Sequence, residues 1–159
     1  MVRVEHTVVI YRPVKEVFEF LTDPENNRLW QDGVVKSRKI SEGRVNVGTR
    51  GEDIRKYLGR EFQTTYEIVE YQPDKKLRFK SLSGPMKFEG SYTLESVNEG
   101  TRFSFSIQGE AGPFAALMGA LAERMARKQV ERDAANLKRL LESNQHHADR
   151  EGTNTSPAG

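Results

Sequence analysis

The spacing of apolar positions changes along the chain and so separates its expected elements. Residues 2–11 are rich in Val and Ile and place apolar side chains at every second position, which predicts a β-strand. Residues 13–21 repeat apolar side chains at helical spacing. Asp23-Pro24-Glu25 then supplies an N-cap acid, a proline and a first-turn acid before residues 26–30. Two short helices are therefore expected after the first strand.

From Val34 onward, apolar side chains recur at every second position, and turn residues interrupt them at fairly regular intervals. The turns are Glu42-Gly43, Leu58-Gly59, Gln72-Pro73-Asp74, Ser83-Gly84-Pro85 and Asn98-Glu99-Gly100. This pattern predicts six further strands. Because the connections are short, neighbouring strands should be antiparallel, and the sheet should have one apolar face that another element covers.

A long helix is predicted over Gly112–Ser143, where Pro113 suits a first helical position and good helix formers follow. Its apolar side chains fall into two stripes. A large-residue arc contains Phe114, Leu117, Met118, Leu121 and Met125, and a small-residue stripe contains Ala116, Gly119, Ala126, Val130, Ala134, Leu137 and Leu141. This helix is the only expected element large enough to cover the sheet. The pattern leaves open which stripe faces it.

Length and charge narrow the class of protein. The 159 residues are enough for one domain with a sizeable core. The net charge is only +2, with acids and bases interspersed, so no nucleic acid is expected as a partner. The first residues lack the apolar run of a signal peptide, and no stretch is long enough to span a membrane, so a cytoplasmic protein is expected.

Composition also limits the chemistry. The chain has no cysteine and three histidines, two of them near its end, so no metal site is expected. Neither a nucleophile elbow nor a phosphate-binding glycine loop occurs in the sequence. No cofactor and no catalytic residue is assigned.

Four segments carry a resemblance to a known group of proteins. They are residues 12–26 (RPVKEVFEFLTDPEN) with Trp30 after them, Val47–Arg50 (VGTR), Leu58–Phe62 (LGREF) and Glu99–Phe103 (EGTRF). On these motifs the chain resembles the START-like (SRPBCC) superfamily, and within it the bacterial polyketide cyclase/dehydrase and lipid-transport group. The motifs are turn, cap and packing signals, so they are informative about the fold and not about the ligand.

The resemblance implies an α+β helix-grip (Bet v 1-like) fold, in which a curved seven-stranded antiparallel sheet wraps around the long C-terminal helix. It assigns residues 1–143 to a START-like domain. Residues 144–159 have little apolar content and are expected to form a disordered polar tail. In such proteins a cavity between sheet and helix binds a lipid, sterol, polyketide or aromatic compound, and only some members are enzymes.

Ten residues are predicted to contact such a ligand. Alternation places six aromatic side chains on the covered face of the sheet, the long helix contributes three apolar side chains, and a tryptophan lies near the expected mouth. For each aromatic residue, ordinary core packing is the alternative. The ten residues are Tyr66, Phe79, Phe88, Tyr92, Phe103, Phe105, Met118, Leu121, Met125 and Trp30.

The third strand leaves one question open. Arg50 and Glu52 alternate with Asp53 and Arg55, so one acid and one base should point inward in either register. A salt-bridged pair at the edge of the sheet is the ordinary interpretation. Because burying an ion pair is costly, a pair inside the cavity would indicate a functional site.

Three functions are consistent with these patterns. The leading hypothesis is a binding protein for a hydrophobic small molecule, since aromatic residues gather on one face and no catalytic constellation is recognisable. The second is an enzyme similar to polyketide aromatase/cyclases or dehydrases, in which tyrosines or the inward acid and base move protons. The third is a protein-interaction module. A monomer or a homodimer is expected.

Overall fold

The computed structural model describes residues 2–110 and 112–154, with the side chains of residues 112–118 and 144–154 outside the description. The order of elements predicted from the sequence is confirmed. The elements are β1 (Val2–Ile10), α1 (Val14–Thr22), the 3-10 helix η1 (Pro24–Asn26), α2 (Asn27–Trp30), β2 (Val34–Lys39), β3 (Arg50–Tyr57), β4 (Arg60–Gln72), β5 (Lys76–Ser83), β6 (Lys87–Val97), β7 (Gly100–Glu110) and α3 (Gly112–Asn154).

The short helices begin at the signals expected for them. Pro13 lies directly before α1 and occupies its N-cap position. The carboxylate of Asp23 accepts a hydrogen bond from the Glu25 backbone N–H at 3.0 Å, as an N-cap acid does. The expected second helix consists of η1 and the single turn α2, because the Asp23-Pro24-Glu25 signal starts a 3-10 turn first.

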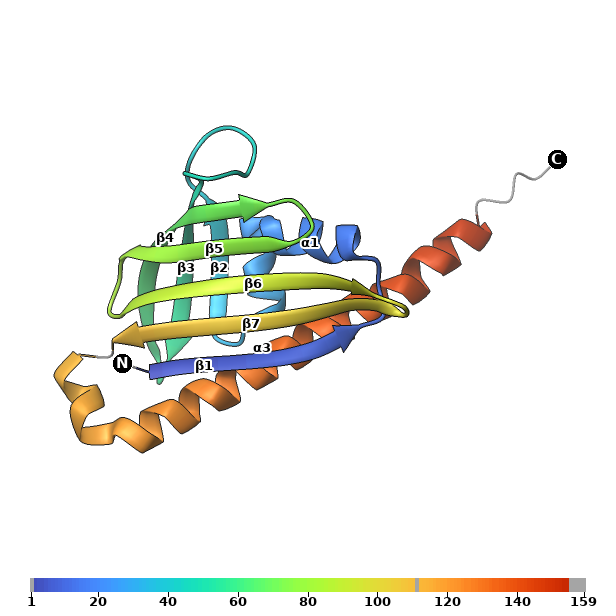
Figure 1. Cartoon of the computed structure of the whole chain (residues 1–159). Helices are drawn as coiled ribbons and strands as arrows, with labels where there is room; N and C mark the ends of the chain where they lie inside the picture. The colour runs from blue at the N-terminus through green and yellow to red at the C-terminus, as the bar shows by residue number, and fades with distance from the viewer. Residues whose placement is uncertain (1, 111, 155–159) are drawn as a thin grey trace.

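The seven strands form one antiparallel sheet in the order β1-β7-β6-β5-β4-β3-β2 (Figure 1). Strands β2 to β7 form a meander in which each pairs with the next along the chain, and β1 pairs with β7 at one edge. The sheet is curved, and α3 and the short helices lie on its inner side (Figure 1). The fold is therefore the predicted α+β helix-grip architecture.

Helix α3 lies against β1, with smaller contacts to β7 and α2 (Figure 1). From Ala126 onward its small-residue stripe faces inward, whereas Gly119 near the start of the stripe is exposed. Leu121 and Met125 of the large-residue arc are each 49% exposed. The other members of that arc fall on residues whose side chains are outside the description. The buried members of the small-residue stripe are Val130, Ala134, Leu137 and Leu141.

The core is built around Trp30, which is 1% exposed. The centroid of its ring lies 5.7 Å from the ring centroid of Tyr92 and 5.8 Å from that of Phe105, in the edge-to-face arrangements that aromatic pairs favour. Leu137 of α3 and Val17 of α1 are fully buried in the same cluster. These contacts join the short helices, the sheet and α3 into one core.

Helix α3 continues past Ser143, the end predicted from the sequence, to Asn154. The predicted tail of residues 144–159 lies in the part of the chain whose side chains, or whole residues from 155 on, are not described. The boundary at residue 143 therefore stays a prediction. Among the described residues, no helix is both long and apolar enough to cross a membrane.

Candidate functional site

A cavity of about 720 Å³ lies between the sheet, the short helices and α3. Drug-sized ligands occupy pockets of roughly 300–1,000 Å³. Ala122, Ala126 and Val130 line the cavity from α3. Ala122 and Ala126 leave space that larger side chains at these positions would fill, so the small residues of α3 contribute to the cavity.

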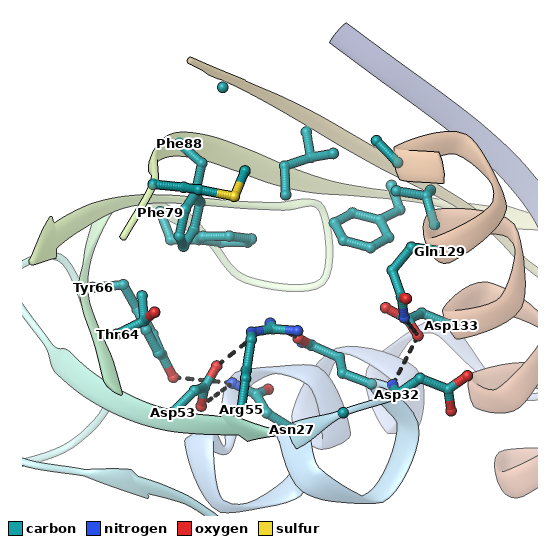
Figure 2. Close-up of a pocket in the computed structure, with 18 of the residues that line it drawn as sticks. Asn27, Asp32, Asp53, Arg55, Thr64, Tyr66, Phe79, Phe88, Gln129 and Asp133 are labelled. Carbon is teal, nitrogen blue, oxygen red and sulfur yellow. Dashed lines mark hydrogen bonds and ion pairs between the residues drawn. The ribbon is translucent and has the colours of Figure 1, made fainter. Parts of the chain in front are cut away.

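One wall of the cavity is aromatic. Five of the predicted ligand residues line it, all from the sheet, namely Tyr66, Phe79, Phe88, Tyr92 and Phe105. Figure 2 shows Phe79 and Phe88 on the side of the cavity opposite Asp53 and Arg55. The alternation of apolar positions in β4 to β7 therefore identified the aromatic wall correctly, while contact with a ligand stays a prediction.

Two of these rings lie across glycines. Gly51 is the cross-strand partner of Tyr66, and Gly90 is the partner of Phe79. A Cβ atom added at either glycine would overlap the ring of its partner. The glycines let both rings lie flat against the sheet, which keeps the cavity open.

The other predicted ligand residues are not brought to the cavity. Trp30 and Phe103 belong to the core, where they are 1% and 0% exposed, and neither lines the cavity. Leu121 and Met125 point away from it because α3 turns its small-residue stripe inward. Met118 lies among the residues whose side chains are not described.

The question of the third strand has a definite answer. Asp53 and Arg55 line the cavity. Glu52 lies on the other face, where it forms an ion pair with Arg38 at 3.2 Å and accepts a hydrogen bond from Gln63 at 2.5 Å. Arg50 is exposed. An acid and a base therefore face the cavity together. The sequence could not distinguish this arrangement from the one in which Arg50 and Glu52 face inward.

Two side-chain amides of the short-helix region form hydrogen bonds with the polar groups that line the cavity. Asn27 donates from Nδ2 to the Tyr66 hydroxyl at 3.1 Å and, at a longer 3.4 Å, to Oδ1 of Asp53. Gln31 accepts at Oε1 from Nη2 of Arg55 at 2.6 Å and donates to the Tyr92 hydroxyl at 3.4 Å. Figure 2 shows the Arg55 guanidinium extending into the cavity from this network.

The surroundings of Asp53 change its acidity. The carboxyl is 5% exposed, and burial raises its pKa to about 6 although Arg55, 3.9 Å away, acts in the opposite direction. Burial and the nearby Asp53 carboxylate also raise the pKa of Tyr66 above its ordinary value. At neutral pH, Asp53 is thus mostly ionised and Tyr66 keeps its proton.

A second buried acid borders the cavity from α3. Asp133 is 3% exposed and accepts hydrogen bonds from the Asp32 backbone N–H and from Nε2 of Gln129, both at 2.9 Å (Figure 2). Burial raises the pKa of Asp133 to about 6 despite these bonds. Its position ties α3 to the segment after α2, on the opposite side of the cavity from Tyr66 (Figure 2).

Sequence reasoning missed Asn27, Gln31 and Asp133. A usable signal existed for the two amides, since their spacing of one helical turn puts them on the same side of the second short helix. Asp133 precedes Ala134 of the small-residue stripe, and its burial depends on the close approach of the Asp32 backbone. That approach is a tertiary feature with no local signature.

The chemistry of the site is that of an apolar chamber with one polar wall. The described residues contain no group of three or more His, Cys, Asp or Glu side chains arranged to hold a metal ion. The aromatic wall suits the body of a hydrophobic molecule. Arg55 and Asp53 offer a hydrogen-bond donor and an acceptor side by side to a polar group of that molecule.

The sequence and the structure were compared with known proteins. A family model described as polyketide cyclase/dehydrase and lipid transport matches residues 1–142. No curated protein matches this sequence. The structure of TTHA0849 from Thermus thermophilus is similar with a TM-score of 0.75 and 21% identity, covering 89% of this chain and 98% of that one.

Two further solved structures share the fold. A START superfamily protein from Mycobacterium smegmatis has a TM-score of 0.75 and 13% identity, with 89% of this chain and 97% of that chain covered. The di-domain ARO/CYC BexL from the BE-7585A biosynthetic pathway has a TM-score of 0.67 and 18% identity, with 89% of this chain and 47% of that chain covered. Because the family model spans nearly the whole sequence, the chain belongs to the family described as polyketide cyclase/dehydrase and lipid transport.

Proposed function

We propose that this protein binds a hydrophobic small molecule, such as a lipid, a polyketide or an aromatic compound, in the cavity between the sheet and α3. The observation that carries the proposal is the cavity of about 720 Å³ with its aromatic wall. A chain of this size ordinarily fills its interior at close to crystal density, so a space this large needs an occupant or a function. The family description, which includes lipid transport, supports the same class of ligand.

The second candidate is an enzyme that acts on a ligand of this kind. The inward Asp53 and Arg55 favour it, because a cavity used only to hold an apolar molecule has no need of an ion pair in its wall. The similarity to BexL, whose name describes an ARO/CYC di-domain, is compatible with this candidate but shows the fold alone.

Copurification tests the binding function directly. The purified protein is analysed by native mass spectrometry before and after extraction with an organic solvent, and the extract is analysed for small molecules. The stripped protein is then titrated with a fluorescent fatty acid and with anilinonaphthalene sulfonate. A bound mass that extraction removes, or saturable binding of one molecule of probe, is expected. A protein that carries no ligand and binds neither probe would contradict the proposal.

A further inference from the structure

We propose that the end of the molecule where the cavity opens docks on the surface of a lipid bilayer that contains anionic lipids. The docking surface is a rim of exposed apolar side chains and cations in three segments, residues 56–62, 82–87 and 119–132. Docking there places the mouth of the cavity against the bilayer, so a hydrophobic ligand can pass between the two without crossing water. Passage of a ligand rests on the proposed binding function, whereas docking itself does not.

The cavity reaches the surface at this end of the fold. Tyr57, at the end of β3, and Met86, in the β5–β6 connection, both line the cavity although they are 56% and 50% exposed. Ala122, from the early turns of α3, lines it as well. Figure 1 shows the tips of the β3–β4 and β5–β6 hairpins and the early turns of α3 at the same end of the molecule. The three segments therefore border the mouth.

Each of the three segments exposes large apolar side chains. Leu58, at the tip of the β3–β4 hairpin, is 86% exposed. Leu82 and Met86 are exposed on either side of the β5–β6 turn. Leu121 and Met125 lie one helical turn apart on α3, and neither lines the cavity. Apolar side chains that separate segments bring to one end of a protein mark an interaction site, unlike exposed apolar residues that are scattered singly.

Cations accompany these apolar side chains. The three segments contain seven Lys or Arg and three Asp or Glu, whereas the net charge of the whole chain is only +2, so positive charge is concentrated at the rim. Arg124, Lys128 and Arg132 are exposed at four-residue intervals along α3, on the side of Leu121 and Met125. A helix with cations beside an exposed apolar stripe has the pattern of helices that lie in the interface of a bilayer.

The charge of the rim favours a bilayer over a second copy of the chain. Arg127 and Arg132 have acid partners, Glu123 at 3.4 Å and Asp32 at 3.5 Å. Among the described residues, the other five cations of the rim have no acid within ion-pair distance. Two rims that faced each other would bring these unpaired cations together, which opposes association. Anionic lipids supply the opposite charge, and the acyl region accepts the apolar side chains.

Vesicle flotation tests docking without knowledge of the natural ligand. The stripped protein is mixed with vesicles of phosphatidylcholine, or of phosphatidylcholine and phosphatidylglycerol, and the bound fraction is measured after flotation. We expect the partition coefficient to be at least about tenfold higher for vesicles that contain phosphatidylglycerol. High salt should reduce this binding, because it screens the attraction between exposed charges.

One variant removes apolar side chains of the rim without changing its charge. Leu58→Asn/Leu121→Gln should lower the partition coefficient by about tenfold, since less apolar surface enters the bilayer. Asparagine suits the φ of 50° at residue 58. The matched control is Ile40→Gln/Val47→Gln, which also removes two exposed apolar side chains. These two residues lie in the β2–β3 connection, at the other end of β3, so the control should bind vesicles like wild type.

A second variant removes charge. Arg124→Gln/Lys128→Gln should lower the partition coefficient for anionic vesicles by about tenfold or more. Its matched control, Lys15→Gln/Lys75→Gln, removes two exposed cations outside the rim and should bind like wild type. Both rim variants should also take up the fluorescent fatty acid from vesicles more slowly, while their affinity for it in solution is unchanged. Thermal melts confirm that every variant is folded.

The outcomes separate docking from ligand binding. If the wild-type protein does not bind anionic vesicles, or if the rim variants bind them as well as their controls do, docking is wrong even when the fluorescent fatty acid binds. A protein that does not float, and that forms a dimer which Leu58→Asn/Leu121→Gln dissociates, would show that the rim is a contact between copies and would overturn the proposal. If the rim binds vesicles but the cavity takes up neither probe, docking stands and the proposed function fails.

Discussion

Burial of the Asp53 carboxylate lowers the stability of the fold and at the same time makes the carboxylate more basic. Its carboxyl is buried beside a single cation, with one long hydrogen bond from Asn27, which is less than an ionised buried acid needs for full compensation. The raised pKa is the measure of that deficit. Groups with perturbed pKa values are concentrated at functional sites, and Asp53 also lines the cavity beside Arg55, which is why the enzyme candidate centres on these two residues.

The raised pKa values predict an unusual dependence of stability on pH. Folding raises the pKa of Asp53 and of Asp133 to about 6, so the folded state binds their protons more tightly than the unfolded state does. Each buried carboxylate lowers the free energy of unfolding. This effect is complete above the folded-state pKa of about 6 and is lost as the pH falls below the pKa of the carboxyl in the unfolded state. Lowering the pH from neutral to about 5 should therefore raise the free energy of unfolding by about 1 kcal/mol for each carboxyl.

Urea unfolding at the two pH values measures this effect. Glu52 and Glu70, whose pKa values lie below the ordinary one, take up protons only at still lower pH and do not mask it. The double variant Asp53→Asn/Asp133→Asn should lose most of the difference. A wild-type protein that is less stable at the lower pH would contradict the description of these two carboxyls.

The inward face of β3 could not be predicted from the sequence. In β3 both possible faces contain one acid and one base, so alternation alone cannot choose between Asp53 with Arg55 and Glu52 with Arg50. The choice is made by tertiary contacts. Gly51, on the same face as Asp53, accommodates the ring of Tyr66 from β4, while Glu52 finds Arg38 and Gln63 on neighbouring strands.

Among the elements, the strands were the most predictable. In β5 to β7 strict alternation gave the buried face correctly, because these strands have one face in the interior and one in water. The glycines at 51 and 90 have no such signature. Their role is visible only once each is paired with an aromatic residue of the neighbouring strand.

Replacing Gly90 tests how those glycines keep the cavity open. Gly90→Ala places a Cβ atom against the Phe79 ring and should push the ring into the cavity, at a cost of about 1–3 kcal/mol in the free energy of unfolding and with weaker probe binding. Chemical denaturation and a fluorescent fatty-acid titration measure the two effects.

Gly119→Ala is the control for that change. A Cβ atom at Gly119 meets nothing within 4 Å, and the residue is exposed on α3, so alanine should leave binding unchanged and stabilise the helix by up to about 1 kcal/mol. Equal losses of stability in both variants would show that the contact with Phe79 is not the cause.

Helix α3 was predicted as an element but not in its orientation. Two apolar stripes are usual for a helix buried on more than one side, and the hydrophobic pattern cannot rank them. In the structure, close packing along β1 selects the stripe of small residues, as the burial of Ala134 and Leu137 shows. Leu121 and Met125 were therefore assigned to the wrong side of the cavity wall.

At the scale of the whole molecule, the two halves of α3 differ in what they contact. Its later turns, with Leu137 and Leu141, complete a dense core with the short helices and the edge of the sheet. Its earlier turns present Ala122 and Ala126 to the cavity. The resemblance to a known superfamily predicted this architecture, whereas no local pattern indicated how much of the interior would stay unfilled.

The central claim is that this unfilled space is where the ligand binds. Ala126 lines the cavity, while its neighbour Met125 is 49% exposed and does not. The same substitution at these two adjacent positions, Ala126→Phe and Met125→Phe, therefore adds a ring either inside the cavity or outside it.

The most direct test compares the affinity of the stripped wild-type protein and of both variants for the same fluorescent fatty acid. Ala126→Phe should weaken binding by at least about tenfold, the equivalent of about 1.4 kcal/mol, while Met125→Phe should bind like wild type. Thermal melts confirm that both variants are folded. Unchanged binding by a folded Ala126→Phe variant would contradict the claim that the cavity between the sheet and α3 is the binding site.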